Sequence, residues 1–456
     1  MEIFGVNLDD AQVSAIKDEA KTVIVSAGAG SGKTQTILGK VKYLIEEKDI
    51  KENEILCISL TNETVNNLKV KLEKMNYKVD VMTFHKLGLS LMDEKVSIVS
   101  DDYLSYIIDE YMLSFIKNNK LRNKIFKRIF FTESNMEKIM KTHDYLELKK
   151  VIITFIKYIK SNDLDIRKIK IGNIGYINRE ILKMILEIYI IYTEELSSSG
   201  KIDFDDMIKN SSCKKVYVNY KYIIIDEFQD TSVLRLNLIR NIMKYNDIKL
   251  FLVGDDWQSI YAFSGCTLDI FVNINKYLDD VSYHQLKYTY RNSQELITAS
   301  GKFVMKNKYQ LIKDIISYIH EDKPIVILYD YQINDVLKYI KGDVMIIGRC
   351  NKDIENIQWV NKYTIHKSKG LEADNVILVN SDNIPFKHKS HELLDYFLKT
   401  NEGIKYPEER RLFYVALTRT KKKIYIMVNN HESIFVHELR KNYKEFITIK
   451  KNGKPF

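Results

Sequence analysis

The sequence contains few residues of the kinds that mark secreted, metal-cluster or low-complexity proteins. Only four of its 456 residues are cysteine and only four are proline. The four cysteines stand far apart without a CxxC pair, which argues against a zinc knuckle or an iron–sulfur cluster and favours a reducing compartment. The few prolines and 17 glycines exclude a low-complexity chain.

Long apolar runs are also absent. The apolar patch from Ile181 to Tyr192 is interrupted by Lys183 and Glu187, so it falls well short of the ~18 residues that a membrane span needs. The N-terminus has no basic region followed by an apolar run. We therefore expect no membrane segment, no export and a cytoplasmic location.

The composition is that of a soluble globular protein with more than one domain. Hydrophobic residues make up 45% of the chain and charged residues 29%, which excludes a disordered chain. A length of 456 residues predicts two to four domains. The net charge of +9 makes an anionic partner plausible, although charge alone is weak evidence for nucleic acid.

The strongest local signal is TVIVSAGAGSGKTQT, from Thr22 to Thr36. An apolar run is followed by a loop of small residues and then by a helical pattern, which predicts a strand, a phosphate-binding loop and a helix. Lys33 would reach the β- and γ-phosphates of a nucleotide, and the Thr34 hydroxyl would hold Mg²⁺. The predicted loop residues are Ala27, Gly28, Ala29, Gly30, Ser31, Gly32, Lys33 and Thr34.

A second signal is YIIIDEFQD, from Tyr222 to Asp230, where a continuous apolar run ends in two acids. Parallel strands present functional groups at their carboxyl ends, so we expect both acids to face the phosphate loop. Asp226 would hold Mg²⁺, mostly through water, and Glu227 would orient and deprotonate an attacking water. The alternative is a chance acidic pair at a strand end.

Isolated polar and aromatic residues near other predicted strand ends give weaker signals. Gln258 lies where an amide could sense a γ-phosphate. Tyr261 and Phe263 follow it in a polar loop, where stacking on unpaired bases and burial in a core are both open. Gln12 could pair with an adenine edge, although a lone Gln on a helix is usually solvated. His85 alone would more often be structural.

The region from about Lys86 to Leu196 has helical periodicity, and we interpret it as an inserted helical subdomain. Its basic run from Lys117 to Arg128 is either a solvated helix face or a surface that follows phosphates. The acids of KIDFDDMI, from Lys201 to Ile208, would cap a helix or lie near the metal site.

Taken together, nine motifs in order resemble the superfamily 1 helicases of the UvrD/Rep/PcrA type, and GDDWQSIY is most similar to helicase IV. The matching runs are LDDAQ, AGAGSGKT, SLTNETVNNL, TFHKLG, DEFQD, GDDWQSIYAFSG, LKYTYRN, TIHKSKGLEADNVIL and EERRLFYVALTRT. The resemblance covers nearly the whole chain except the helical insertion. It implies ATP and Mg²⁺ as cofactors.

The resemblance assigns further residues to the nucleotide. Gln12 would read adenine, Tyr290 would stack on it and Glu372 would bind the ribose. Arg291 and Arg419 would contact the γ-phosphate, where the transition state of phosphoryl transfer spreads charge over the equatorial oxygens. The implied catalytic residues are Lys33, Asp226, Glu227, Gln258, Arg291 and Arg419.

The resemblance also implies a track for single-stranded DNA. Leu60 stands where relatives often have Phe, and Phe263 with Ser264 stands where PcrA-like enzymes have Trp and Arg, which suggests a weaker grip on bases. Trp257 has no assigned role. The implied DNA contacts are Thr61, Asn62, Phe84, His85, Tyr261, Phe263, Thr364 and His366.

The expected fold is α/β, with two RecA-like motor domains, 1A and 2A, and an all-helical 1B insertion. We assign residues 1–87 and 199–285 to domain 1A, residues 88–198 to 1B and residues 286–456 to 2A. Only 72 residues separate Arg291 from Thr364. This leaves no room for the large 2B insertion of UvrD-like enzymes.

The function implied is an ATP-dependent translocase or helicase, moving 3′ to 5′ on single-stranded DNA or a 3′-tailed duplex, in repair, recombination or replication restart. We expect a monomer or a complex with a protein partner such as a nuclease or a repair factor. Two alternatives remain. The small size and missing 2B resemble the UvrD-like subunit of the Gabija anti-phage system, and an ATP-gated module could sense DNA ends without moving.

Overall fold

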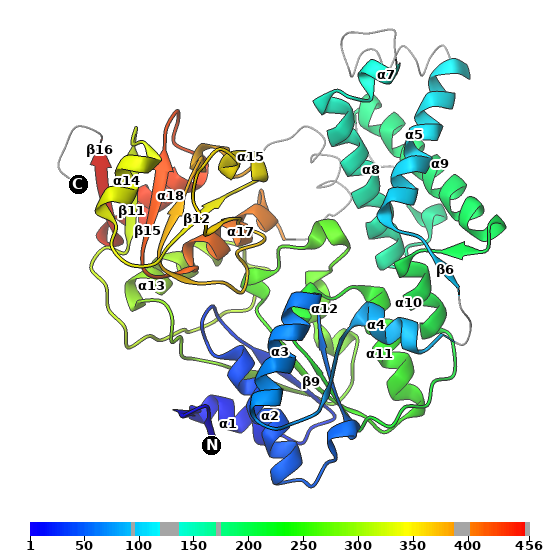
Figure 1. The fold of residues 1–456 in the computed structure, drawn as a ribbon, viewed down its shortest axis with the longest axis horizontal. Coiled ribbons are helices and arrows are strands. Elements are labelled where there is room, and N and C mark those ends of the chain that lie inside the picture. The colour runs from blue at the N-terminus through cyan, green and yellow to red at the C-terminus, as the bar shows by residue number, and fades with distance from the viewer. Residues whose placement is uncertain (93–95, 119–135, 170–174, 387–401, 452–456) are drawn as a thin grey trace.

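The computed structural model describes residues 1–92, 96–118, 136–169, 175–386 and 402–451. Its described residues form two parallel sheets, each of six strands and covered by helices, and a group of helices that stands apart from both sheets (Figure 1). The expected α/β fold with two motor domains and a helical insertion is therefore confirmed. Among the described residues, no helix is long and apolar enough to cross a membrane.

The first sheet has the strand order β10-β3-β9-β8-β4-β5, and every neighbouring pair is parallel. Alternate side chains of its apolar strands point to opposite faces, so each face is buried under helices. Val23 and Val25 pack on one face and Ile24 on the other. The strands are β3 (Thr22–Ser26), β4 (Ile55–Ser59), β5 (Asp80–Thr83), β8 (Tyr222–Ile225), β9 (Lys249–Gly254) and β10 (Val281–Gln285).

Helices from separate parts of the chain cover this sheet. One face packs against α1 (Asp10–Lys17), α2 (Lys33–Glu46) and α3 (Asn62–Lys74). The other face packs against α4 (Phe84–Ser90), α10 (Phe204–Ser212), α11 (Val233–Tyr245) and α12 (Leu268–Val272). Because α4 precedes the helical insertion and α10 follows it, the insertion leaves this domain and returns to it on the same face (Figure 1).

The second sheet is also parallel, with the order β13-β12-β14-β15-β11-β16. Its strands are β11 (Ile325–Tyr329), β12 (Val344–Gly348), β13 (Lys362–Thr364), β14 (Ala373–Leu378), β15 (Thr420–Val428) and β16 (Ile447–Lys451). The helices α13 (Gln294–Val304), α17 (Pro407–Leu417) and α18 (Ile434–Asn442) cover one face, while α14 (Ile333–Tyr339) and α15 (Asn351–Ile354) cover the other.

The insertion has its own apolar core, formed in its described part by three long helices and one short helix. They are α5 (Asp101–Asn118), α7 (Met136–Ile139), α8 (His143–Ser161) and α9 (Tyr176–Ser198). The region also contains the short strand β6 (Ser97–Ile98), which pairs in parallel with β7 (Lys201–Ile202), so it is not wholly helical. The basic run from Lys117 to Arg128 lies outside the residues whose side chains are described.

The end of α8 contacts the first domain next to the loop that contains Phe263. The Asn162 side chain donates to the Gly265 carbonyl at 3.1 Å and accepts a hydrogen bond from the Thr267 hydroxyl at 2.6 Å. The insertion is thus joined directly to the Phe263 loop.

Asp203 caps α10 by accepting a hydrogen bond from the Asp206 amide at 2.9 Å, which fits the capping interpretation of KIDFDDMI.

The segment between Arg291 and Thr364 is described throughout, and it contains α13, β11, α14, β12 and α15. All of these elements belong to the second domain or its covering helices. The described structure therefore holds no additional domain at this point, as its length predicted.

Candidate functional site

The loop between β3 and α2 has the geometry of an anion-binding cradle. Gly30 and Gly32 adopt φ angles of 71° and 81°, which glycine reaches without strain. The Ser31 hydroxyl donates to the Gly28 carbonyl at 3.0 Å and fixes the bend of the loop. Within the described residues no side chain caps α2, so the first N–H groups of this helix can bind a phosphate.

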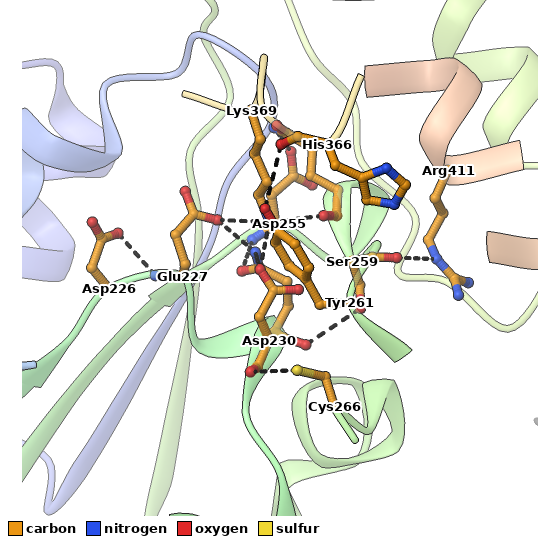
Figure 2. Close-up of polar contacts among 12 residues, drawn as sticks. Asp226, Glu227, Asp230, Asp255, Ser259, Tyr261, Cys266, His366, Lys369 and Arg411 are labelled. Atoms are coloured by element: carbon orange, nitrogen blue, oxygen red, sulfur yellow. Dashed lines mark hydrogen bonds and ion pairs between the residues drawn. The ribbon is translucent and has the colours of Figure 1, made fainter. Parts of the chain in front are cut away.

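Glu227 lies between Lys33 of the first domain and Lys369 of the second, and Figure 2 shows it beside Lys369. Its carboxylate is 3.2 Å from Lys33 Nζ and 3.4 Å from Lys369 Nζ, and it accepts a hydrogen bond from Gln229 Nε2 at 2.5 Å. Burial by itself raises the pKa of the Glu227 carboxyl. The charges of the two lysines lower this pKa by more than burial raises it, so it lies well below its usual range. Its φ of 52° is a costly conformation for a residue with a side chain. Glu227 is therefore an ionised acid in a strained position.

Asp226 is the second acid at the end of β8. Its carboxylate accepts a hydrogen bond from the Glu227 amide at 2.9 Å. Burial and the charge of Glu227 raise the pKa of Asp226 to about 6. A cation bound at this carboxylate would favour its charged form. The described ranges contain no group of three or more His, Cys, Asp or Glu that could hold a metal ion, so Mg²⁺ would need oxygen ligands from Thr34, Asp226, phosphates and water.

Two arginines of the second motor domain contact the first: Arg291 packs against the phosphate loop and Arg419 contacts Gln258. Arg419 is 1% exposed and donates from Nη2 to Gln258 Oε1 at 2.9 Å. Burial and the nearby charge of Arg291 lower the pKa of Arg419 to about 9. A Cβ built on Gly30 would lie 2.5 Å from the Cβ of Arg291, so only glycine fits against this arginine. The structure thus brings Arg291, Arg419 and Gln258 together at the cradle.

The residues predicted at the base and ribose lie beside the same loop. Gln12 is 2% exposed and donates to the Ser31 carbonyl at 3.4 Å. The Tyr290 hydroxyl donates to Asp9 at 2.8 Å, while the residue remains 53% exposed. An exposed ring held at its hydroxyl end can stack on a flat base. Glu372 accepts from Arg291 Nε at 2.7 Å, so these two predicted nucleotide residues pair with each other here.

The rings of Tyr261 and Phe263 from the first domain form a cluster with His366 from the second. The Phe263 centroid is 5.8 Å from that of Tyr261 and 5.5 Å from that of His366, and Tyr261 is 6.2 Å from His366. Phe263 is 44% exposed, in a loop rather than in a core. Burial, together with Arg349 and Lys369, lowers the pKa of His366 to about 3, so its ring is neutral. The cluster offers aromatic surface without charge.

The other predicted DNA contacts differ in how exposed their side chains are. Phe84 is 5% exposed and packs in the core beneath the first sheet. The ring of His85 lies 5.0 Å from that of Phe204, and burial with nearby Arg235 lowers its pKa to about 4. Thr61 and Asn62 are exposed at the start of α3. Thr364 is 8% exposed at the end of β13.

Sequence reasoning missed Lys369. Its Nζ atom is 2.5 Å from Asp230 Oδ2 and also donates to the Gln258 carbonyl at 2.9 Å. Removing one partner of such a buried ion pair costs about 3–5 kcal/mol. The run TIHKSKG contains the lysine, but the sequence gives no sign of its partners, because they lie more than a hundred residues earlier.

Comparison with known proteins identifies two family domains. Residues 8–279 match the model of the UvrD/REP helicase N-terminal domain, and residues 349–431 match that of the UvrD-like helicase C-terminal domain. DNA helicase IV of Escherichia coli K12 is 25% identical over an alignment that covers 95% of this chain and 70% of the relative. A probable DNA helicase II homolog of Mycoplasma capricolum is 27% identical, with 84% of this chain and 53% of the relative covered.

Other similarities are more partial. The ATP-dependent DNA helicase PcrA of Staphylococcus aureus Mu50 is 23% identical, with 66% of this chain and 40% of the relative covered. Among solved structures, the PRRSV helicase aligns with a TM-score of 0.38 at 11% identity, over 91% of this chain and 54% of that chain, which is too weak to support a conclusion. The chain spans about half the length of several relatives it matches. Because the N-terminal model alone matches more than half of the chain, the protein belongs to the UvrD/REP helicase family.

Proposed function

We propose that this protein is an ATP-dependent motor that moves along single-stranded DNA. The observation that supports this most strongly is the meeting of the two domains at the phosphate loop. The cradle and both acids belong to the first domain, while Arg291, Arg419 and Lys369 come from the chain that leads into and forms the second. A nucleotide bound here would contact both domains, so its hydrolysis would change how they fit together.

The chemistry we propose is hydrolysis of ATP. Lys33 would bind the β- and γ-phosphates, and Thr34 with Asp226 would hold Mg²⁺, which supplies charge neutralisation when bound. Glu227 would accept the proton of the attacking water. Lys33 contacts Glu227 in this structure, so Lys33 must exchange this carboxylate for phosphate when ATP binds. That exchange would free Glu227 to act on water.

We assign recognition of the base and the ribose to Gln12, Tyr290 and Glu372. For the domains we propose residues 1–87 and 199–285 as 1A, residues 88–198 as 1B and residues 286–456 as 2A. The contact between Glu372 and Arg291 supports a coupled role, because a ribose bound to Glu372 would release Arg291 toward the phosphates. Gln258 would then sense the γ-phosphate through its amide.

The DNA track we propose runs over the carboxyl ends of the strands of both sheets. Phe263, Tyr261 and His366 form its centre, since they are the aromatic cluster shared by the two domains. Thr61, Asn62, His85 and Thr364 would contact the backbone around it. Phe84 would act from the core, by supporting His85. Movement from 3′ to 5′, and a place in repair, recombination or replication restart, are carried over from the family.

We expect this protein to separate long duplexes poorly by itself. No domain is inserted between Arg291 and Thr364 in the described structure, so this segment supplies no arm that could engage duplex ahead of the motor. The measurement is single-turnover unwinding of short and long 3′-tailed duplexes, with released protein trapped after one binding event. The short duplex should open and the long one should not.

Two outcomes would contradict parts of this proposal. Processive separation of the long duplex by monomeric protein would mean that the helical insertion or another segment replaces the missing arm. ATP hydrolysis that responds to single-stranded DNA without any movement along it would favour an ATP-gated DNA sensor. Movement that becomes processive only with a nuclease or repair factor would support a partner-dependent motor.

A further inference from the structure

A buried lysine lies directly behind the phosphate loop. Lys313 belongs to the segment between α13 and β11, and its side chain is fully buried. Its Nζ atom is 2.5 Å from Asp255 Oδ1 and 2.6 Å from Asp256 Oδ1, and it donates to the Ala27 carbonyl at 2.8 Å. A buried cation persists only where charged and polar partners surround it. Here the partners come from the phosphate loop and from the loop after β9.

The residues around Lys313 fix its position, and they give Trp257, which had no assigned role, a structural one. Lys313 Nζ lies 5.0 Å from the centre of the Trp257 ring, a cation–π distance. The indole N–H donates to the Leu311 carbonyl at 3.0 Å, and the Trp257 ring also makes a T-shaped contact with Tyr414 of α17, at 5.5 Å between the ring centres. Trp257 is therefore a packing residue between the Lys313 segment and the second domain.

The same segment supports the phosphate loop by close packing. A Cβ built on Gly28 would collide with the side chain of Ile315. Ala29, Trp257 and Ile315 belong to one small apolar cluster. The segment around Lys313 thus packs against the phosphate loop at Gly28 and Ala29.

Asp255 connects Lys313 to the residues proposed to contact the γ-phosphate. One carboxylate oxygen of Asp255 accepts from Lys313, and the other accepts from Gln258 Nε2 at 2.5 Å. With its amide nitrogen held by Asp255, Gln258 presents Oε1 to Arg419 Nη2 at 2.9 Å. A continuous series of polar contacts therefore joins the Ala27 carbonyl, Lys313, Asp255, Gln258 and Arg419.

We propose that Lys313 is a positioning residue that aligns Gln258 and Arg419 with the phosphate loop. The inference rests on the proposed ATP hydrolysis. Without the lysine, Asp255 and Asp256 would be two adjacent buried carboxylates without a cation, and their repulsion would move Asp255. Gln258 would then lose the contact that orients its amide. The nucleotide would still bind, because Lys33, the loop N–H groups and the packing of Ile315 on Gly28 remain, but the transition state would be less well stabilised.

The test compares Lys313→Met with Lys308→Met, which removes an exposed lysine from the same segment. We expect Lys313→Met to lower kcat by about tenfold to a hundredfold, as small misplacements of catalytic groups do. Binding of a fluorescent, non-hydrolysable ATP analogue should change by less than about threefold, which is under one kcal/mol. Lys308→Met should match the parent in both measurements.

A double variant separates positioning from a general loss of structure. If Lys313 acts through Gln258, the variant with Lys313→Met and Gln258→Ala should hydrolyse ATP as fast as Gln258→Ala alone. Multiplied losses would overturn the inference. If Lys313→Met does not fold, as judged by its melting transition, Asp255→Asn enters the same cycle. Asn keeps the shape of Asp255 but has one acceptor oxygen, so it cannot hold both Lys313 and Gln258 as the two carboxylate oxygens do.

The remaining outcomes distinguish this inference from the function on which it rests. If the parent hydrolyses ATP and Lys313→Met hydrolyses it equally fast, only the role of Lys313 is overturned. A parent that hydrolyses no ATP would overturn the proposed function and this inference together.

Discussion

Replacing Glu227 with Gln is expected to lower ATP turnover by about 10³-fold, because an amide cannot accept the proton that a general base takes from water. The acid is held between Lys33 and Lys369, and its pKa lies well below the usual range. Gln has nearly the same shape but only one acceptor oxygen, so it cannot hold both lysines as the two carboxylate oxygens do. Lys33 leaves this side chain when it binds phosphate, and ATP binding does not need that contact. ATP binding should therefore survive, and Glu227→Gln should trap the nucleotide-bound state.

The measurement for Glu227→Gln is kcat from phosphate release, together with ATP affinity from equilibrium binding. Glu47→Gln is a matched control, since it changes an exposed glutamate at the end of α2. It should behave as the parent does. A Glu227→Gln protein that hydrolyses ATP at the parent rate would contradict the assignment of the base and direct attention to Asp226.

Replacing Arg419 with Lys is expected to cost at least about 10³-fold in kcat, the lower end of the range for arginines that stabilise the phosphoryl-transfer transition state. Lysine keeps the charge but not the planar fork of donors. Arg419 uses its guanidinium for Gln258 Oε1 and for the Val415 carbonyl. A lysine cannot hold both contacts and also reach a phosphate oxygen.

The control for Arg419→Lys is Arg240→Lys, an exposed arginine of α11 that contacts no part of the proposed site. Phosphate release should be measured at saturating ATP and single-stranded DNA, and the melting transition should be recorded because Arg419 is buried. A folded Arg419→Lys protein with less than about a tenfold loss would contradict a direct role in the transition state.

Strands that are short apolar runs with a motif directly behind them could be predicted from the sequence. The run before Asp226 is an example: the predicted strand begins at Tyr222, as β8 does. Parallel sheets bury both faces, so this pattern is nearly continuous and easy to recognise. The strand β6 escaped prediction because two residues are too short to show a period.

The contacts between side chains could be predicted only in part. The sequence places Phe84 at a strand end, but it cannot show that α4 begins at this residue and turns the ring into the core. Lys369 and Lys313 carry no local signal, since their partners lie in distant segments. The motifs identify which residues meet the ligand. The buried charges that hold those residues become visible only when the segments are placed together in space.

The central claim is that ATP hydrolysis is driven by contact with single-stranded DNA along the aromatic cluster. The most direct test is steady-state ATP turnover with and without oligothymidylate, for the parent and for Phe263→Ala. Base stacking on an aromatic side chain contributes about 1–3 kcal/mol, so the DNA concentration for half-maximal stimulation should rise at least about fivefold in Phe263→Ala, with basal turnover unchanged. If the ATP turnover of the parent is the same with and without single-stranded DNA, the account is contradicted.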